Sequence, residues 1–221
     1  MSKASLYDSS IAQKFIVGLT GLFLCSFLVV HLTGNLLLFK DDGGAAFDAY
    51  SEFMSTNAVI RTMELVLAAG FLTHVAYATR VWLKNRKARP TRYAMNRPME
   101  NSSLASRSMH WTGAVVFIFL VVHLRTFFVP ARFSGGSMPS MFELVQSAFS
   151  SPLYDAFYLV SLALLGYHLR HGFQSAFQSL GVRPFARAVI EIVAVIFWLI
   201  IPIGFATMPV YFLWRHLTGV S

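Results

Sequence analysis

Five long apolar segments restrict this chain to an all-α fold within a membrane. They cover residues 16–39, 59–83, 110–129, 153–177 and 186–214, and each reaches the roughly 20 residues that a helix needs to cross a bilayer. With 56% hydrophobic and 13% charged residues, the chain is too apolar for a soluble domain of 221 residues. We expect a single membrane domain over residues 1–221, without sequence repeats, whose five helices span about 11–39, 58–84, 107–129, 152–178 and 186–215. That length leaves no soluble catalytic domain, so any substrate chemistry in water is expected on another chain.

The positive charge of the chain follows the loops between the apolar segments. The net charge is +8, and the basic residues cluster over residues 84–107 and 183–187 without the interleaved aromatic residues of a nucleic-acid surface. We therefore expect no nucleic acid as a partner. Placing these two loops inside puts about 13 of the 18 Lys and Arg residues there, as the positive-inside rule requires. The sequence thus predicts a multi-pass protein with a cytoplasmic N-terminus and a C-terminus outside.

Two loops on the outer side, residues 40–58 and 130–152, carry signals for local structure. Residues 41–44 read Asp-Asp-Gly-Gly and predict a turn. Ser140 and Glu143 form an S-x-x-E capping pattern ahead of apolar residues, which predicts a short interfacial helix. Ser151 followed by Pro152 predicts the N-cap and the first residue of the fourth helix.

Some side chains interrupt the apolar segments or stand out within them. Pro202 and Pro209 are expected to kink or end the fifth helix near its outer half. Cys25 is expected to be a small buried side chain, because a single cysteine forms no disulfide within the chain. Asp155 and Glu191 lie close to helix ends, where we expect them to be solvated or to cap the helix.

Four of the seven histidines lie in the middle of apolar segments, where a polar ring is costly unless it has a partner. His31, His74, His123 and His168 each belong to a different one of the first four segments. With a rise of about 1.5 Å per residue, His31 and His123 lie roughly 25 and 24 Å from the cytoplasmic end. His74 and His168 lie roughly 15 and 16 Å from it, so the four rings form two pairs at levels about 9 Å apart.

Two imidazoles that face each other at one depth suit a six-coordinate haem, because neutral imidazole nitrogen ligates the iron from both sides. We therefore expect the five-helix bundle to enclose two b haems. The outer haem would lie between His31 and His123, and the inner haem between His74 and His168. The alternative is that each histidine only forms a hydrogen bond with a neighbouring helix.

Small residues next to three of the histidines favour the close approach of a porphyrin. Ala78, Gly172 and Gly34 each lie within one turn of a histidine, whereas bulky Phe127 follows His123 by one turn. His110 and His216 lie near helix ends and are expected at the membrane interface. His171, one turn from His168, competes with it for the role of ligand.

The histidines and the residues around them resemble the di-haem cytochrome b membrane anchors of succinate dehydrogenase and fumarate reductase, in their single-chain, five-helix form. The likeness covers essentially the whole chain. It rests on Gly21-Leu-Phe-Leu and His31-Leu-Thr-Gly-Asn in the first helix, His74 in the second, His123 in the third and His168-Leu-Arg-His-Gly172 in the fourth. The last motif resembles the H-x-x-x-G element of the family, which favours His168 over His171 as the ligand.

The resemblance implies the same pairing of the four histidines around two b haems. It also implies a flavoprotein subunit and an iron-sulfur subunit docked on the basic cytoplasmic loops, in a bacterial inner (cytoplasmic) membrane. A quinone, expected to be menaquinone, would exchange electrons near the outer haem. Some members have a glutamate two residues before the ligand of the fourth helix, where it takes part in proton transfer. Here that residue is Gly166, so we do not expect that proton route.

Three further kinds of side chain have candidate roles. Glu64 lies toward the outer end of the second helix, where it would contact the quinone or form an ion pair with Arg61. His171 would lie about 4.5 Å closer to the cytoplasm than His168, where we expect it to contact a haem propionate or the iron-sulfur subunit. Arg125 and Arg170 are expected to extend toward the interface.

The sequence therefore predicts an anchor of respiratory complex II that passes electrons between an iron-sulfur subunit and a membrane quinone. As a subunit of that tricarboxylic acid cycle enzyme, it would bind no dicarboxylate itself. One alternative is another b-type electron carrier, such as the anchor of a hydrogenase or formate dehydrogenase, or an ascorbate-reducible cytochrome. The bc-type pattern is disfavoured, because it puts two ligands on each of two helices. A second alternative is a transporter whose histidines relay protons without haem.

Overall fold

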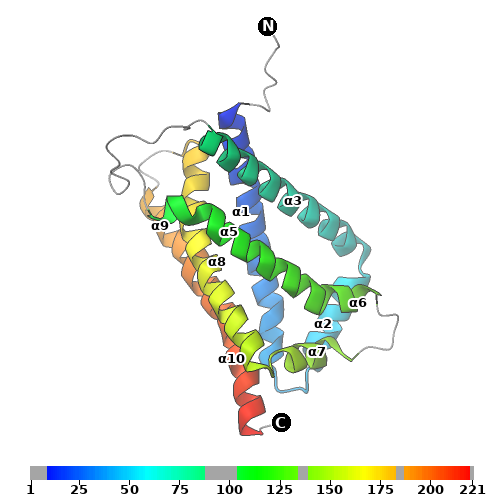
Figure 1. The fold of residues 1–221 in the computed structure, drawn as a ribbon. Helices are drawn as coiled ribbons and strands as arrows, with labels where there is room; N and C mark the ends of the chain where they lie inside the picture. The colour runs from blue at the N-terminus through cyan, green and yellow to red at the C-terminus, as the bar shows by residue number, and fades with distance from the viewer. Residues whose placement is uncertain (1–8, 88–103, 134–138, 183–186, 220–221) are drawn as a thin grey trace.

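The computed structural model describes residues 9–87, 104–133, 139–182 and 187–219, and all regular structure within these ranges is helical (Figure 1). Four helical stretches are long and apolar enough to cross a membrane: Ser10–Phe39, Ala58–Lys87, Arg107–Phe133 and Ala188–Thr218. A fifth is added if α7 (Met141–Ala148) and α8 (Pro152–Ser179), which meet at 94°, are counted as one span. An all-α protein with the helices of a multi-pass membrane protein is thus confirmed in the described residues.

Three of these stretches consist of several helical segments. The first joins α1 (Ser10–Asn35) to the short 3-10 helix η2 (Leu36–Phe39), and the second is the single helix α3 (Ala58–Lys87). The third runs through α5 (Leu104–His123), the π turn η3 (Leu124–Phe128) and α6 (Val129–Phe133). The last runs through α9 (Arg187–Val195), the π turn η5 (Ile196–Ile200) and α10 (Ile201–Thr218).

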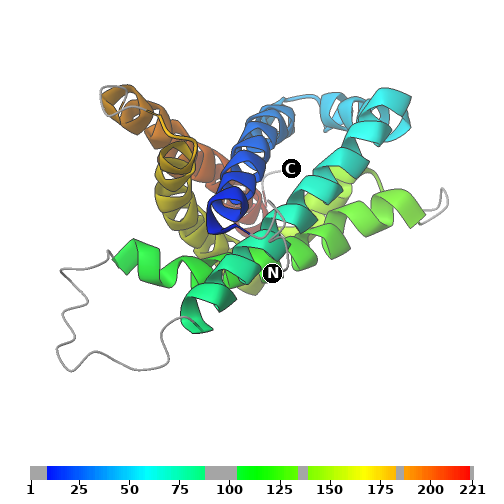
Figure 2. The same ribbon diagram turned by 90° about the horizontal axis from the view of Figure 1, so that it is seen from above.

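Helix α8 is the centre of the bundle. It packs against α1, α5, α9 and α10, and nine of its residues are buried, whereas none of α3 is. Viewed from above, α3 lies at the periphery, where it packs on α1 (Figure 2). The start of α1 and the end of α10 lie at opposite ends of the bundle, which we call the near end and the far end (Figure 1).

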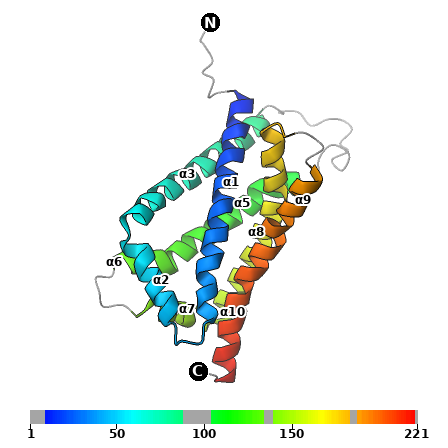
Figure 3. The ribbon, with the colours of Figure 1, turned by 180° about the vertical axis from the view of Figure 1, so that it is seen from behind.

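Two short helices, α2 (Ala45–Thr56) and α7, lie at the far end (Figure 3). The sequence predicted the turn before α2 but not α2 itself. Both carboxylate oxygens of Asp42 accept hydrogen bonds, at 3.1 Å each, from the N–H groups of Gly44 and Ala46. Gly44 has a φ of +91°, and a Cβ there would lie 2.2 Å from Phe142 of α7. Asp48 then accepts a 2.9 Å hydrogen bond from the N–H of Phe142, which joins the two helices.

The predicted helix starts of α7 and α8 are confirmed. The hydroxyl of Ser140 accepts from the N–H of Glu143, and the Glu143 carboxylate accepts from the N–H of Ser140, so the capping box is complete. Ser151 is the N-cap of α8 and Pro152 its first residue, although the Ser151 side chain forms no capping hydrogen bond.

Of the two expected effects of Pro202 and Pro209, a kink or an end of the last helix, the end is not found. The helix continues to Thr218, and Pro209 lies within it. Proline has no N–H to donate to the carbonyl four residues earlier. Here that carbonyl, of Trp198, lies in the π turn η5 and faces Gly166 of α8, where a Cβ would be only 2.6 Å from its oxygen.

Two buried clusters hold the helices together. The far-end cluster is mainly aromatic and includes Phe127, Phe142 and Phe212, and the second cluster includes Cys25, whose thiol is free as expected. Asp155 is only 1% exposed and neither carboxylate oxygen forms a hydrogen bond, so the expectation of a solvated or capping group is wrong. The cause is the packing of α8 in the centre of the bundle, because Asp155 lies on the buried side of its first turn, whereas Pro152 and Leu153 on the other side are exposed.

Part of the basic region that sets the expected membrane orientation lies outside the described residues. This applies to Arg89, Arg92, Arg97 and Arg183. The orientation therefore stays a prediction of the sequence.

Candidate functional site

The rings of His31 and His123 meet between α1 and α5. Their centroids are 5.7 Å apart and their planes are at 86°. Two imidazoles on opposite sides of one metal ion, each at a metal–nitrogen distance of about 2 Å, have ring centres on the order of 6 Å apart. Aromatic rings surround the pair, with Phe27 stacked on His31 at 5.2 Å and Phe205 at 5.5 Å. The structure thus brings together the two residues that the sequence assigned to the outer haem.

His74 on α3 and His168 on α8 are the second pair that the sequence assigned, and each ring contacts a threonine of a neighbouring helix. Nδ1 of His74 lies 3.2 Å from the hydroxyl of Thr20 and 3.2 Å from the carbonyl of Val17. The Thr20 hydroxyl donates to the carbonyl of Ile16 at 2.7 Å, so it accepts from the histidine ring.

The surroundings of His168 match those of His74. Its Nδ1 lies 3.3 Å from the hydroxyl of Thr112 on α5, which itself donates to the carbonyl of Met109 at 3.1 Å. A Cβ on Gly113, the next residue, would lie 3.4 Å from Cε1 of His168. The corresponding Cβ on Gly21 would lie 3.2 Å from Cε1 of His74. A threonine and the glycine that follows it therefore position each ring. The threonine hydroxyl accepts the hydrogen bond from Nδ1, and the glycine, which has no side chain, leaves room for the ring.

The ring nitrogens of the outer pair are held differently. Nδ1 of His123 lies 2.9 Å from the hydroxyl of Tyr158 on α8. Nδ1 of His31 has only a long contact of 3.5 Å with the amide of Asn35, whose nitrogen donates to the His31 carbonyl at 2.7 Å. Three of the four rings thus have an oxygen acceptor at Nδ1.

None of the four Nε2 atoms has a hydrogen-bond partner among the described residues. Metal-ligating histidines almost always donate from one ring nitrogen to an oxygen and bind the metal through the other. The donor set therefore fits haem, with two imidazoles for each iron. Within the described residues no group of three or more His, Cys, Asp or Glu side chains gathers as a site for a free metal ion.

The two pairs of histidines are connected with a repeat in the sequence. We had expected no sequence repeat. Residues 20–32 read TGLFLCSFLVVHL and residues 112–124 read TGAVVFIFLVVHL, so eight of 13 positions are identical. His31 corresponds to His123 in this alignment, and the threonines that precede them contact His74 and His168 respectively. Helices α1 and α5 thus carry the same T-G-x9-H pattern, and in each the threonine contacts a histidine of another helix.

The repeat also corrects the spacing of the two levels. Eleven residues separate Thr20 from His31, and eleven separate Thr112 from His123. Measured along α1 and α5, this is about 16 Å, compared with about 9 Å expected from the distances to the ends of the apolar segments.

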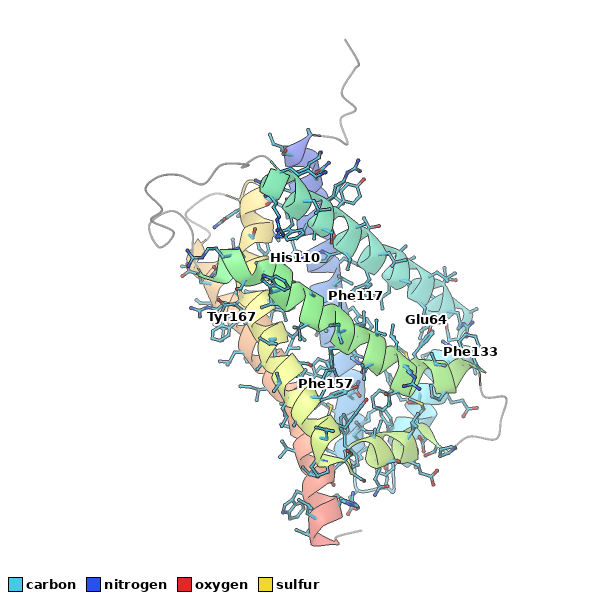
Figure 4. The ribbon with its side chains drawn as sticks, viewed as in Figure 1. Glu64, His110, Phe117, Phe133, Phe157 and Tyr167 are labelled. Carbon is cyan, nitrogen blue, oxygen red and sulfur yellow. The ribbon has the colours of Figure 1, made fainter. Side chains whose placement is uncertain are left out.

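Glu64 lies near the far end, in an ion pair that the sequence did not predict. Its carboxylate accepts a short hydrogen bond from Arg132 of α6, which also donates to the carbonyl of Ser55 at 2.8 Å. The expected partner, Arg61, is more distant at 3.6 Å and half exposed. Figure 4 shows Glu64 beside Phe133, where α3 meets α6. The carboxylate therefore has cationic partners already, and its contact with a quinone stays a hypothesis.

The other candidate residues have varied surroundings. A Cβ on Gly172 would meet only Met109, at an ordinary 3.7 Å, so there is room beside His168. Gly34, in contrast, makes room for Tyr50 of α2, which a Cβ would approach to 2.4 Å, and not for a porphyrin. His171 is partly buried and forms no hydrogen bond with the described residues.

Two more of the singled-out residues pack on tryptophan. His110 stacks on Trp82 at 3.7 Å, which joins α5 to α3 at the near end (Figure 4). Arg170 lies over the ring of Trp198 at 5.3 Å, in agreement with a side chain directed away from the histidines. Outside the spans, burial raises the pKa of the Tyr50 hydroxyl.

Sequence reasoning missed Thr20, Thr112, Gly113 and Tyr158. The repeated T-G-x9-H pattern was the signal for the first three, whereas no pattern marks Tyr158. Comparisons of the chain with protein-family models, with curated proteins and with solved structures find no match.

Proposed function

We propose that this chain is the cytochrome b membrane anchor of a succinate:quinone oxidoreductase, that is, of a succinate dehydrogenase or fumarate reductase. One observation carries the proposal. Four mid-helix histidines lie on four successive helices, the rings of His31 and His123 are 5.7 Å apart, and none of the four Nε2 atoms has a hydrogen-bond partner in the part of the chain that the structure describes. His31 and His123 would hold one haem b, and His74 and His168 the other. When bound, each haem supplies a one-electron iron couple.

The residues of the chain would serve this function by fixing the imidazoles. The oxygens of Thr20, Thr112 and Tyr158 would hold Nδ1–H and so direct Nε2 toward the iron. The aromatic rings around His31 would exclude water from the outer pair. Gly21 and Gly113 would let α1 and α5 approach the rings of the inner pair.

The choice of this oxidoreductase class rests on the resemblance of the motifs and on the topology. One ligand on each of four successive spans argues against the bc-type arrangement. In the proposed assembly, a flavoprotein subunit and an iron-sulfur subunit bind at the cytoplasmic side, which is the near end. The chain passes electrons between the iron-sulfur subunit and menaquinone or a related quinone in the lipid bilayer.

The test is to purify the chain from its native membrane with its partner subunits attached. We expect a flavoprotein and an iron-sulfur protein to co-purify, and the complex to reduce a naphthoquinone with succinate or to reduce fumarate with the corresponding quinol. Co-purification with a hydrogenase or formate dehydrogenase subunit would instead support the alternative class of anchor. A chain that carries no haem and moves protons would support the transporter.

A further inference from the structure

Asp155 is a buried carboxyl group that the two histidine pairs do not use. It lies in the first turn of α8, is only 1% exposed, and neither of its oxygens has a hydrogen-bond partner among the described residues. A carboxylate buried in this way is costly when it is ionised, unless a cation or several donors compensate its charge. The surroundings therefore favour the neutral carboxyl, which holds a proton.

The carboxyl is directed toward the last span. Asp155 precedes Gly166 by eleven residues, which is about three turns, so the two residues lie on the same side of α8. At Gly166 this side lies against the Trp198 carbonyl and the ring of Pro202. Helix α8 begins at the far end and α10 ends there (Figure 1), and Pro209 and Phe212 of α10 are fully buried. Asp155 is thus enclosed between helices.

The helices packed against α8 provide no partner for this carboxyl. They are α1, α5, α9, η5 and α10. Of these, η5 has no titratable side chain, and α9, which carries Arg187 and Glu191, lies toward the near end (Figure 1). None of the titratable or charged groups toward the far end forms a hydrogen bond with Asp155. These groups are His31 of α1, His123 of α5, Arg125 of η3, Tyr154 and Tyr158 of α8, and Tyr211, Arg215 and His216 of α10.

Asp155 lies one turn from the residue that contacts the outer histidine pair. Tyr158 follows it by three residues, a rise of about 4.5 Å, and the Tyr158 hydroxyl lies 2.9 Å from Nδ1 of His123. In the proposed function this pair binds a haem, which carries one net positive charge when oxidised and none when reduced. Salt screens buried charges only weakly, so this change of charge acts on the carboxyl.

We propose that Asp155 is the proton-uptake site of the outer haem, an inference that rests on the proposed function. The positive charge of the oxidised state favours the carboxylate. When one electron arrives, that charge is lost, an O–H bond forms on Asp155, and one proton enters from the aqueous phase at the far end. When the electron leaves, the O–H bond breaks and the proton returns. Ser151, which is exposed and lies one turn before Asp155, is close to that aqueous phase.

The test is a redox titration at several pH values, on the full chain purified with its haems in lipid nanodiscs. The outer haem is identified as the spectral component that His123→Leu removes. In the wild type its midpoint potential is expected to fall as the pH rises, because reduction then has to take up a proton. Asp155→Asn is neutral at every pH, so we expect it to keep the potential that the wild type has at acid pH and to lose the fall.

Glu191→Gln makes the same chemical change at an exposed residue of α9 and is the matched control, with the pH dependence of the wild type expected. Infrared difference spectra between the oxidised and reduced states give a second readout. The band of a neutral carboxyl is expected to grow on reduction in the wild type and not in Asp155→Asn.

An outer-haem potential with the same pH dependence in Asp155→Asn as in the wild type would overturn the proposal. An equal loss of that dependence in Glu191→Gln, or a wild type whose carboxyl band does not change on reduction, would overturn it as well. These results all concern protein with haem bound. Failure of the proposed function is distinct from them, because it would appear as a chain without haem before any titration.

Discussion

At the residue scale, His74 and His168 hold equivalent positions in the two pairs of helices, but the number of hydrogen-bond acceptors near Nδ1 differs between them. Among the described residues the His168 ring has one hydrogen-bond partner, Thr112, whereas the His74 ring has Thr20 and the Val17 carbonyl. Thr112→Val is therefore expected to weaken binding of the inner haem by about tenfold or more, and Thr20→Val by less. Titration of the apo-protein with haem measures both. Equal losses in the two variants would contradict the assignment of these acceptors.

A substitution of Tyr158 tests the hydrogen bond to the outer histidine pair in the same way. Its hydroxyl accepts from Nδ1–H of His123 in the proposed state, which makes the imidazole more basic and favours ferric iron. Tyr158→Phe is expected to raise the midpoint potential of one haem, while Thr112→Val raises that of the other. A spectroscopic redox titration separates the two. A shift of the same spectral component in both variants would contradict the separation into an outer and an inner pair.

His168 and His171 allow a second test at this scale. Of the two histidines, His168 alone has a hydroxyl partner at Nδ1 among the described residues, and this partner is Thr112 of α5. His168→Leu is expected to abolish the inner haem, and His171→Leu to keep it. The measurement is the haem content of each purified variant. Two haems in His168→Leu, together with one in His171→Leu, would reverse the assignment.

The four candidate ligands could be predicted from the sequence, because a histidine in the middle of an apolar segment is recognised from its position alone. The partners of their Nδ1 atoms were not predicted, since they depend on which faces of α1, α5 and α8 turn toward one another. Tyr158 shows this most clearly, because a tyrosine in an apolar segment has no pattern to distinguish it. Asp155 was misjudged for the same reason, as its distance along the chain from the helix end did not reveal its burial.

At the element scale, the contact between α8 and the π turn η5 depends on one glycine. A Cβ on Gly166 would lie 2.6 Å from the Trp198 carbonyl oxygen, which is a backbone atom and cannot move alone. Gly166→Ala is therefore expected to cost about 1–3 kcal/mol of unfolding free energy, or roughly 3–10 °C in Tm. Gly172→Ala, on the same helix but with only an ordinary contact to Met109, is the control and should change Tm little. Equal Tm values for both variants would contradict the close approach of α8 and η5.

The close contact between α8 and η5 also explains why residue 166 is a glycine. Some of the anchors that the histidine motifs resemble have a glutamate at this position, and this chain has Gly166. No side chain fits between α8 and η5 without separating them. The absence of that carboxylate is therefore a consequence of how the last span packs in this chain.

The ion pair between Glu64 and Arg132 joins α3 to α6, and α3 has no buried residues of its own. Glu64→Gln is expected to lower Tm by a few degrees, because about 1 kcal/mol of charge-assisted hydrogen bonding is lost. Arg61→Gln is the control, since its ion pair is longer and half exposed. A larger loss of Tm in Arg61→Gln would show that Arg61 is the main partner.

The elements themselves were largely predictable. Apolar length predicted the long helices, and the capping patterns predicted the starts of α7 and α8. Helix α2 was missed because its short, mixed sequence has no strong period and its stability depends on Phe142 and α7. The continuation of the last helix past Pro202 depends on the π turn η5, which no sequence pattern announced.

At the scale of the whole molecule, two parallel helix pairs are related by a repeat that places equivalent histidines opposite each other. The rings of His31 and His123 meet, and the equivalent threonines Thr20 and Thr112 contact His74 and His168. His31→Leu and His123→Leu are therefore expected to remove the same spectral component and to spare the other. Loss of the same component from His31→Leu and His74→Leu would contradict this pairing. Depth along the apolar segments predicted the pairing, and the repeat is an independent reason for it.

The central claim, that the four histidines bind two haems, is tested most directly by the amount of haem b per chain. The chain is purified from its native membrane, and haem is measured as the pyridine haemochrome against protein determined by amino-acid analysis. Two complete pairs of imidazoles predict a ratio of two haems b per chain. A ratio of one, or no haem at all, would contradict the account.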